Sequence, residues 1–296
     1  MKATIAHFAG MPRTGTTFFY YFLRQHPQIF VPVRKETNFF SVEYDRGEKW
    51  FRALYKRAPE STVSLDVSPL YFLDANVAKR ITQFNPLAKV IVGIRQPSDW
   101  IVSAYKQKQT QTAVMPSFEK FIEHFDWNIR SHMLPVDFTP DFVSNRIEEY
   151  RKEFGENVLF YDYRELKRDP LGLLNRVEEF LGLDRHFTKA NFQNKIINSS
   201  QRETNRGLNV FLAQDWVIDL ITRVFPDKMI MWAKNRYFGE GSAKKQTHEE
   251  SKLLYTEEEA ATWRDLAIER FKEEDNRISD MFAEAPYWRG ETPWRI

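Results

Sequence analysis

The sequence predicts a three-layer α/β fold, in which helices flank a central parallel sheet. Its 296 residues are enough for one large α/β domain. Short apolar runs that are typical of strands alternate with longer segments that are typical of helices. Because consecutive parallel strands are joined by right-handed crossovers, this alternation favours a parallel sheet. Ligands of such sheets lie beyond the carboxyl ends of the strands, so we expect the motifs that follow strands to converge.

The predicted strands are short apolar runs. Residues 4–9 form a mostly apolar strand that leads straight into a glycine-containing loop. Residues 63–67 alternate apolar and polar side chains, and residues 89–94 (Lys-Val-Ile-Val-Gly-Ile) are apolar almost throughout. Residues 157–161 supply another strand. These segments make up the expected sheet.

The first helix is predicted over residues 16–25. It ends before Pro27, because the residue that precedes a proline is pushed out of the helical region. Further helices are predicted near residues 75–84, 98–107, 118–125, 146–154 and 171–181. Residues 239–252 are the most loop-like stretch, and we interpret them as a connector, with a mobile lid or the capped start of the last helix as alternatives. We expect a single domain over residues 1–296, with a helical region at about 107–145 and a C-terminal helical segment at about 253–288.

Composition excludes several classes of site. The formal net charge is only +2, so any anion site must be local, and no nucleic-acid partner is indicated. The chain has no cysteine, which excludes disulfides, cysteine metal sites and thiol nucleophiles. No stretch approaches the roughly 18 apolar residues of a membrane span, and the N-terminus lacks the apolar run of a signal peptide. We therefore expect a cytoplasmic protein without a membrane span.

The loop after the first strand has the pattern of a phosphate-binding loop, as in P-loop-containing nucleotide hydrolases. Gly10 and Gly15 frame it, and a helix follows, so backbone N–H groups and the helix N-terminus favour an anion. Thr16 occupies the position of the usual P-loop lysine, and the cation lies earlier, at Arg13. A triphosphate needs lysine and metal together, whereas one 5′-phosphate that bears a sulfonate carries less charge. The predicted contacts of such a nucleotide are Arg13, Thr14, Gly15, Thr16 and Thr17; alternatively, this turn only caps the helix.

A second phosphate receptor is predicted after the strand at 89–94. Arg95 emerges where that strand ends, and Pro97 suits the first turn of a helix. Ser103 lies on this helix, where its hydroxyl can face back toward Arg95. A guanidinium and a hydroxyl together make a good receptor for a terminal phosphate. Alternatively, Arg95 forms a surface ion pair, and Ser103 occupies a helix position without a specific role.

These motifs resemble those of the sulfotransferase family, which uses 3′-phosphoadenosine 5′-phosphosulfate (PAPS). Pro12 to Thr17 resemble its 5′-phosphosulfate loop, and Arg95 with Ser103 resemble its 3′-phosphate motif. The resemblance implies that Tyr163 lies near the adenine and that Arg206 and Gly207 close over the 3′-phosphate. For the last pair, Gln201-Arg202 offers a competing alignment.

The acceptor side resembles the heparan-type branch of that family. Lys35-Glu36 begins a segment similar to its Lys-Glu-x-x-Phe-Phe motif, which implies that Glu36 is the general base; alternatively, Glu36 is a solvated loop acid. Lys35 either neutralises charge on the leaving phosphate or pairs with a carboxylate. Asp66 is the alternative acid. Val67 stands where that branch often has lysine, so a cation is missing. In the small-molecule branch of the family the base is a histidine. This chain has His7, His124 and His132, but none of them lies in a matching motif.

The resemblance implies in-line transfer of a sulfonate from PAPS to a hydroxyl or amine, with adenosine 3′,5′-bisphosphate (PAP) as the product and no metal. Arg13, Lys35 and Glu36 are the predicted catalytic residues. The acceptor is a small molecule, a lipid or a saccharide, and the sequence does not identify which. It does not identify the oligomeric state either. The alternatives are a P-loop small-molecule kinase, against which Thr16 argues, and a non-catalytic nucleotide-binding module.

Overall fold

The computed structural model describes residues 5–60, 62–111, 115–129, 132–190, 192, 229 and 255–283. Apart from residue 229, these belong to one compact unit made of residues 1–197 and 255–296; residues 198–254 are assigned to a second unit. A single domain over residues 1–296 stays a prediction, because most of the second unit lies outside the described residues. None of the described helices is long and apolar enough to cross a bilayer.

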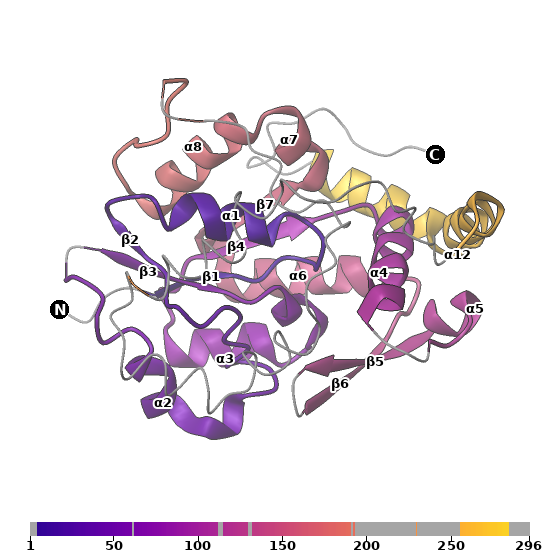
Figure 1. Cartoon of the computed structure of the whole chain (residues 1–296), viewed down its shortest axis with the longest axis horizontal. Helices are drawn as coiled ribbons and strands as arrows, with labels where there is room; N and C mark the ends of the chain where they lie inside the picture. The colour runs from indigo at the N-terminus through magenta and orange to yellow at the C-terminus, as the bar shows by residue number, and fades with distance from the viewer. Residues whose placement is uncertain are drawn as a thin grey trace. The chain divides into compact units, whose positions relative to one another are not determined.

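A five-stranded sheet in the order β2-β3-β1-β4-β7 forms the centre of this unit (Figure 1). Every pairing within it is parallel, so the predicted α/β fold with a central parallel sheet is confirmed. β1 lies between β3 and β4, and the loops that follow β1 and β4 are therefore neighbours at one edge of the sheet. The strands are β1 (Ile5–Phe8), β2 (Ile29–Phe30), β3 (Val63–Val67), β4 (Val90–Ile94) and β7 (Val158–Asp162).

Helices cover both faces of the sheet. α1 and α8 lie on one face, and α3 and α6 lie on the other (Figure 1). The helices are α1 (Thr16–Leu23), α2 (Gly47–Ala53), α3 (Val77–Phe84), α4 (Pro97–Gln111), α5 (Phe118–Phe121), α6 (Phe142–Phe154), α7 (Tyr163–Arg168), α8 (Pro170–Leu181) and α12 (Glu257–Ala283), and 3₁₀ turns span Tyr44–Arg46, Pro69–Leu73 and Gly155–Asn157.

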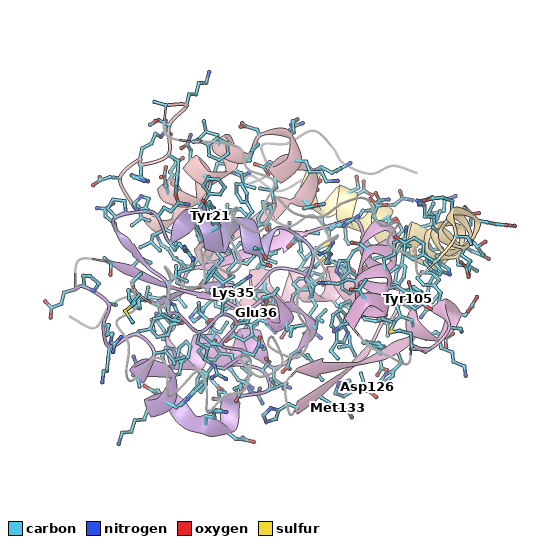
Figure 2. All side chains as sticks on the ribbon, viewed as in Figure 1. Tyr21, Lys35, Glu36, Tyr105, Asp126 and Met133 are labelled. Carbon is cyan, nitrogen blue, oxygen red and sulfur yellow. The ribbon has the colours of Figure 1, made fainter. Side chains whose placement is uncertain are left out.

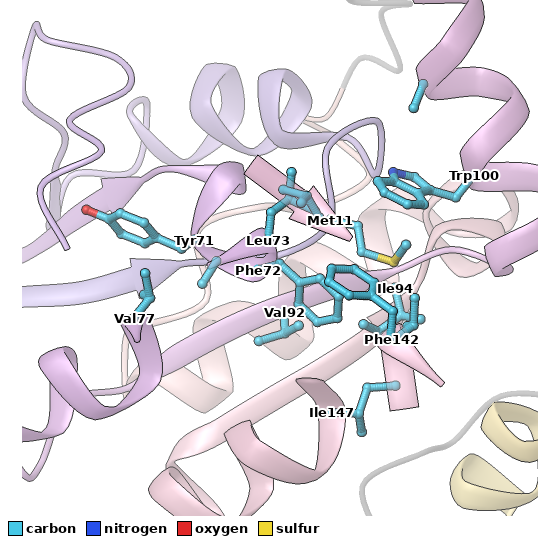
Figure 3. Close-up of a cluster of buried hydrophobic side chains, with 14 of the residues drawn as sticks. Met11, Tyr71, Phe72, Leu73, Val77, Val92, Ile94, Trp100, Phe142 and Ile147 are labelled. Atoms are coloured by element: carbon cyan, nitrogen blue, oxygen red, sulfur yellow. The ribbon is translucent and has the colours of Figure 1, made fainter. Parts of the chain in front are cut away.

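The side chains of the strands alternate between two buried clusters. Val92 and Ile94 of β4 pack with α3, α4, α6 and α12, whereas Ile91 packs on the opposite face with α1 and α8. The first cluster includes Met11, from the loop after β1, and Trp100 of α4 (Figure 3). The loop after β1 is therefore anchored in the core and cannot move independently of α4.

One predicted segment was wrong. Residues 118–125 are not a single helix, and residues 107–145 are not helical throughout, because β5 (His124–Ile129) and β6 (His132–Asp137) form an antiparallel hairpin. The reason is a period of two: Phe125 and Trp127 are buried while Asp126 is exposed, which suits a strand and not a helix. Only the short α5 precedes the hairpin.

Gly10 allows the loop after β1 to pack against β4, and its replacement should destabilise the fold. A Cβ atom at Gly10 would lie 2.3 Å from the backbone nitrogen of Gly93, and Met11 N donates to Gly93 O at 2.8 Å. Because backbone cannot rotate away, we expect Gly10→Ala to lower the free energy of unfolding by about 1–3 kcal/mol or more. Urea denaturation followed by circular dichroism measures this, and an unchanged midpoint would contradict the packing.

Candidate functional site

The loop between β1 and α1 is held in a left-handed conformation at two positions. Arg13 has φ 68° and Gly15 has φ 98°, a region that favours glycine. At Gly15 a side chain would also meet Leu166 Cδ2 at 2.1 Å. The local sequence therefore fixes a sharp turn that ends at the N-terminus of α1, where backbone N–H groups are free of helical partners.

Three side chains brace this loop from different directions. Thr14 Oγ1 donates to Met11 O at 2.6 Å, Tyr161 Oη of β7 donates to Thr14 O at 2.7 Å, and Trp100 Nε1 of α4 donates to Pro12 O at 2.9 Å. The hydroxyl of Thr14 thus shapes the loop, and a phosphate contact by Thr14 would fall to its backbone N–H. Thr16 and Thr17 open α1, with Thr16 largely buried and Thr17 half-buried.

The two sequence-predicted phosphate anchors lie together. Arg95 follows β4, Ser103 lies on α4, and Arg13 Nε donates to Ser103 Oγ at 3.5 Å. Burial lowers the pKa of Arg95, with the nearby Arg13 adding to this and Asp99 and Tyr163 opposing it. Two guanidinium groups are therefore close enough to repel, which is the arrangement expected where an anion binds between them.

Arg95 also has a donor without a partner among the described residues. Its Nε is buried and makes no hydrogen bond to any of them, and its guanidinium lies 5.0 Å from the ring centroid of Tyr163, at the start of α7. A buried unpaired donor is costly unless a ligand satisfies it. The predicted 3′-phosphate anchor and the predicted adenine neighbour are thus in contact, and their roles stay predictions.

Lys35 and Glu36 lie beside the end of the phosphate loop, near the centre of the view in Figure 2. Lys35 Nζ donates to Thr17 Oγ1 at 3.2 Å and lies 5.2 Å from the ring centroid of Tyr20, so this cation faces the start of α1. Burial lowers the pKa of Lys35, and the charge of Glu36 opposes that shift. The cation predicted near the leaving phosphate and the predicted base are therefore brought to the same edge of the sheet.

Asp66 does not have the surroundings of a base. It is fully buried and accepts hydrogen bonds from Thr37 Oγ1 (2.7 Å), Ser68 Oγ (3.0 Å) and Tyr71 Oη (2.7 Å). Ser68 Oγ also accepts from the backbone N–H of Asn38 at 3.1 Å. This network fixes the segment that directly follows Glu36. Asp66 therefore orients the segment that carries Glu36, and the choice of Glu36 over Asp66 as the base stays a prediction.

Of the three histidines singled out in the sequence, His7 lies inside the core, and His124 and His132 lie on the β5–β6 hairpin. His7 is fully buried and packs edge-on against Phe40, with ring centroids 5.2 Å apart. His124 is exposed on the hairpin and pairs with Asp137 at 2.6 Å. Within the residues that the structure describes, no group of three or more His, Asp or Glu side chains is arranged to hold a metal ion. Arg206 and Gly207 lie outside the described residues.

Sequence reasoning missed Lys108 of α4. Its Nζ lies 4.4 Å from the ring centroid of Trp127 and 5.9 Å from that of Phe125, both on the hairpin. Burial lowers the pKa of Lys108, and the charge of Glu36 opposes that shift, so this cation and the predicted base interact electrostatically. Its spacing of five residues from Ser103 does not place the two side chains on one face of α4, since helical neighbours are three or four residues apart. The sequence therefore carries no signal that Lys108 lies near the site, and none for its aromatic neighbours.

Comparisons with known proteins identify the family that this chain resembles. The family described as "Sulfotransferase domain" matches residues 7–216. "Heparan sulfate glucosamine 3-O-sulfotransferase 6" of the mouse is 31% identical over 189 residues, which cover 62% of this chain and 53% of that protein. "Bifunctional heparan sulfate N-deacetylase/N-sulfotransferase 4" of the mouse is 27% identical over 195 residues, which cover 60% of this chain and 22% of that protein.

The chain spans about half the length of the 3-O-sulfotransferase that it matches. Among solved structures, a sulfotransferase from Alicyclobacillus acidocaldarius aligns with a TM-score of 0.50 at 21% identity, over 82% of this chain and 98% of that one. At this identity the likeness supports the fold alone. The matched residues 7–216 include the loop, Lys35-Glu36, Arg95 and Ser103, and end before α12.

Proposed function

The chain belongs to the sulfotransferase family, and we propose that it transfers the sulfonate group of PAPS to a hydroxyl or amine of an acceptor. The observation that carries this proposal is the convergence of Arg13, Ser103 and Arg95 beside a loop that lacks the P-loop lysine. The kinase alternative is not favoured, because Thr16 cannot replace that lysine on a γ-phosphate. PAPS, the co-substrate of the family, supplies an activated sulfonate when bound.

The side chains at this edge fit a nucleotide with two phosphate-bearing ends. The buried unpaired Nε of Arg95 and the hydroxyl of Ser103 suit a terminal 3′-phosphate, and the ring of Tyr163 beside Arg95 suits an aromatic base. The braced loop and the N-terminus of α1 suit the 5′ end. These fits support a PAPS site at the carboxyl ends of β1 and β4.

Lys35, Arg13 and the loop amides are suited to stabilise negative charge as it develops on the leaving 5′-phosphate. Lys35 reaches Thr17 at the start of α1, so its ammonium lies beside the helix N-terminus. Such preorganised donors stabilise the transition state without reorganising during the reaction. Glu36, next in sequence, takes the proton of the acceptor as the new bond to sulfur forms.

The acceptor side includes a wall made by α4 and the hairpin. Lys108 supplies a cation whose charge interacts with Glu36, and Trp127 supplies an aromatic surface beside Lys108. Lys108 thus offers the charge that the sequence lacks at Val67. Since the matched relatives are named for heparan sulfate, a saccharide acceptor with an anionic group is our first choice, ahead of a lipid or another small molecule.

Lys108 should affect the acceptor and not the nucleotide. We expect Lys108→Gln to raise the KM of an anionic acceptor by about three- to tenfold, because a half-buried charge is lost, and to leave the KM of PAPS unchanged. Lys106→Gln is the matched control, since its ammonium lies on the same helix but over Tyr255, 4.6 Å from the ring centroid. If Lys108→Gln and Lys106→Gln changed the KM of the acceptor equally, Lys108 would not be an acceptor-binding residue.

An acceptor screen tests the proposed function. Purified chain, PAPS and panels of saccharides, phenols and lipids are incubated with EDTA, and mass spectrometry detects products that have gained one sulfonate. We expect at least one acceptor class to react without a divalent metal. Transfer of phosphate from ATP, or tight binding of PAP without transfer to any acceptor, would favour the alternatives.

A further inference from the structure

The C-terminal helix α12 carries two adjacent buried carboxylates that the reaction does not use. Glu274 is 3% exposed and Asp275 is fully buried. Burial raises the pKa of both carboxyl groups, and serine hydrogen bonds oppose the shift in each. α12 lies beyond residue 216, where the family match ends, so the shared motifs do not assign either residue a role.

Asp275 accepts hydrogen bonds from the turn that begins α4. Ser98 Oγ donates to Asp275 Oδ2 at 2.6 Å, Ser98 N donates to Oδ1 at 3.3 Å, and Gln96 Nε2 donates to Oδ2 at 2.9 Å. An N-terminal helical turn leaves backbone donors unpaired, and a carboxylate there satisfies them and complements the helix dipole. Asp275 thus caps α4 from another helix, and Gln96, one of its donors, directly follows Arg95.

The helix that Asp275 caps also carries the rest of the nucleotide site. Trp100 Nε1 holds the phosphate loop through Pro12 O at 2.9 Å, and Ser103 Oγ lies 3.5 Å from Arg13 Nε. α12 crosses α4 in Figure 1 and packs on it in the same buried cluster. The position of Arg95, Trp100 and Ser103 therefore depends on how the start of α4 is held.

Glu274, the neighbour of Asp275, makes similar hydrogen bonds to a different helix. It accepts hydrogen bonds from Ser144 N at 2.6 Å and from Ser144 Oγ at 2.9 Å. Ser144 belongs to α6, which carries none of the predicted site residues. The two neighbouring acids therefore make similar bonds to two different helices, of which only α4 carries site residues.

We propose that Asp275 is a positioning residue for the nucleotide, which holds the first turn of α4 so that Arg95 and Ser103 meet the 3′-phosphate. This inference rests on the proposed function of the site. It makes α12, outside the matched residues, part of the nucleotide-binding machinery. Asp275 itself contacts no reacting group.

Isothermal titration of PAP against the full chain tests this, with thermal unfolding measured in parallel. We expect Asp275→Ala to raise the Kd of PAP by about tenfold, because hydrogen bonds to a charged group are lost at the start of α4. Asp275→Asn retains an acceptor for Ser98, so we expect its Kd for PAP to lie between that of Asp275→Ala and that of the unaltered chain. Glu274→Gln is the matched control, and we expect it to change the unfolding temperature while the Kd of PAP stays within about twofold.

The outcomes separate positioning from general stability. The proposal would be overturned if the Kd of PAP were unchanged in both Asp275 variants. It would also be overturned if Glu274→Gln raised the Kd of PAP as much as Asp275→Ala does. If Asp275→Ala does not fold, two milder variants decide the proposal: Asp275→Asn, and Ser98→Ala, which removes one donor. Each of them must still raise the Kd of PAP. If the unaltered chain binds PAP but transfers no sulfonate, the proposed function fails while the Kd comparison still decides this inference. If it does not bind PAP, both fail.

Discussion

Replacing Glu36 by Gln should lower kcat by about 10²–10⁴-fold, because the amide cannot accept the acceptor's proton. The Kd of PAP and the thermal unfolding temperature should stay nearly unchanged, since Glu36 is only half-buried and is not one of the predicted contacts of the nucleotide. Steady-state rates of labelled sulfonate transfer and titration of PAP measure the two quantities separately.

The same assays distinguish Glu36 from Asp66. Asp66→Asn breaks a network of three hydroxyl groups that fixes the segment after Glu36, so it should lower the unfolding temperature by several degrees. A kcat for Glu36→Gln within about threefold of the unaltered chain would show that another group removes the proton.

Replacing Arg95 by Ala should raise the Kd of PAP by about a hundredfold, because charge-assisted hydrogen bonds to a phosphate are lost. The Kd of adenosine 5′-monophosphate, which has no 3′-phosphate, should change much less. Titration of both nucleotides against both proteins gives a cycle that isolates the contact between Arg95 and the 3′-phosphate.

Lysine is not an adequate substitute at this position. Arg95→Lys keeps the charge but loses the planar donor pair and the packing of the guanidinium on Tyr163, so we expect an intermediate Kd. Arg164→Ala, at a half-exposed arginine that pairs with Asp162, is the control. An equal loss of affinity for both nucleotides in Arg95→Ala would contradict an anchor for the 3′-phosphate.

The elements that carry the predicted anchors could be read from the sequence. Strand 89–94 and the turn at Pro97 are local patterns, and they correctly placed Arg95 directly after β4 and Ser103 on α4. Gly15 likewise indicated the turn before α1, since its left-handed backbone suits glycine. Local patterns therefore sufficed wherever one strand and the next helix define the position.

The parts that the sequence left undetermined depend on contacts between distant segments. Asp275 lies 177 residues from Ser98, and no local pattern indicates that pairing. Trp127 was assigned to a helical region because the alternating run that contains it is short and follows directly on α5. The sequence likewise does not show that three hydroxyl groups donate hydrogen bonds to Asp66, so it offered both Glu36 and Asp66 as the base.

The most direct test of the account is a turnover measurement with ³⁵S-labelled PAPS in the presence of EDTA and an acceptor from the screen. We predict that labelled product and PAP form in equal amounts, that Glu36→Gln slows both equally, and that added ATP with Mg²⁺ does not replace PAPS. Release of PAP without labelled product, or a requirement for ATP and Mg²⁺, would contradict sulfonate transfer by this chain.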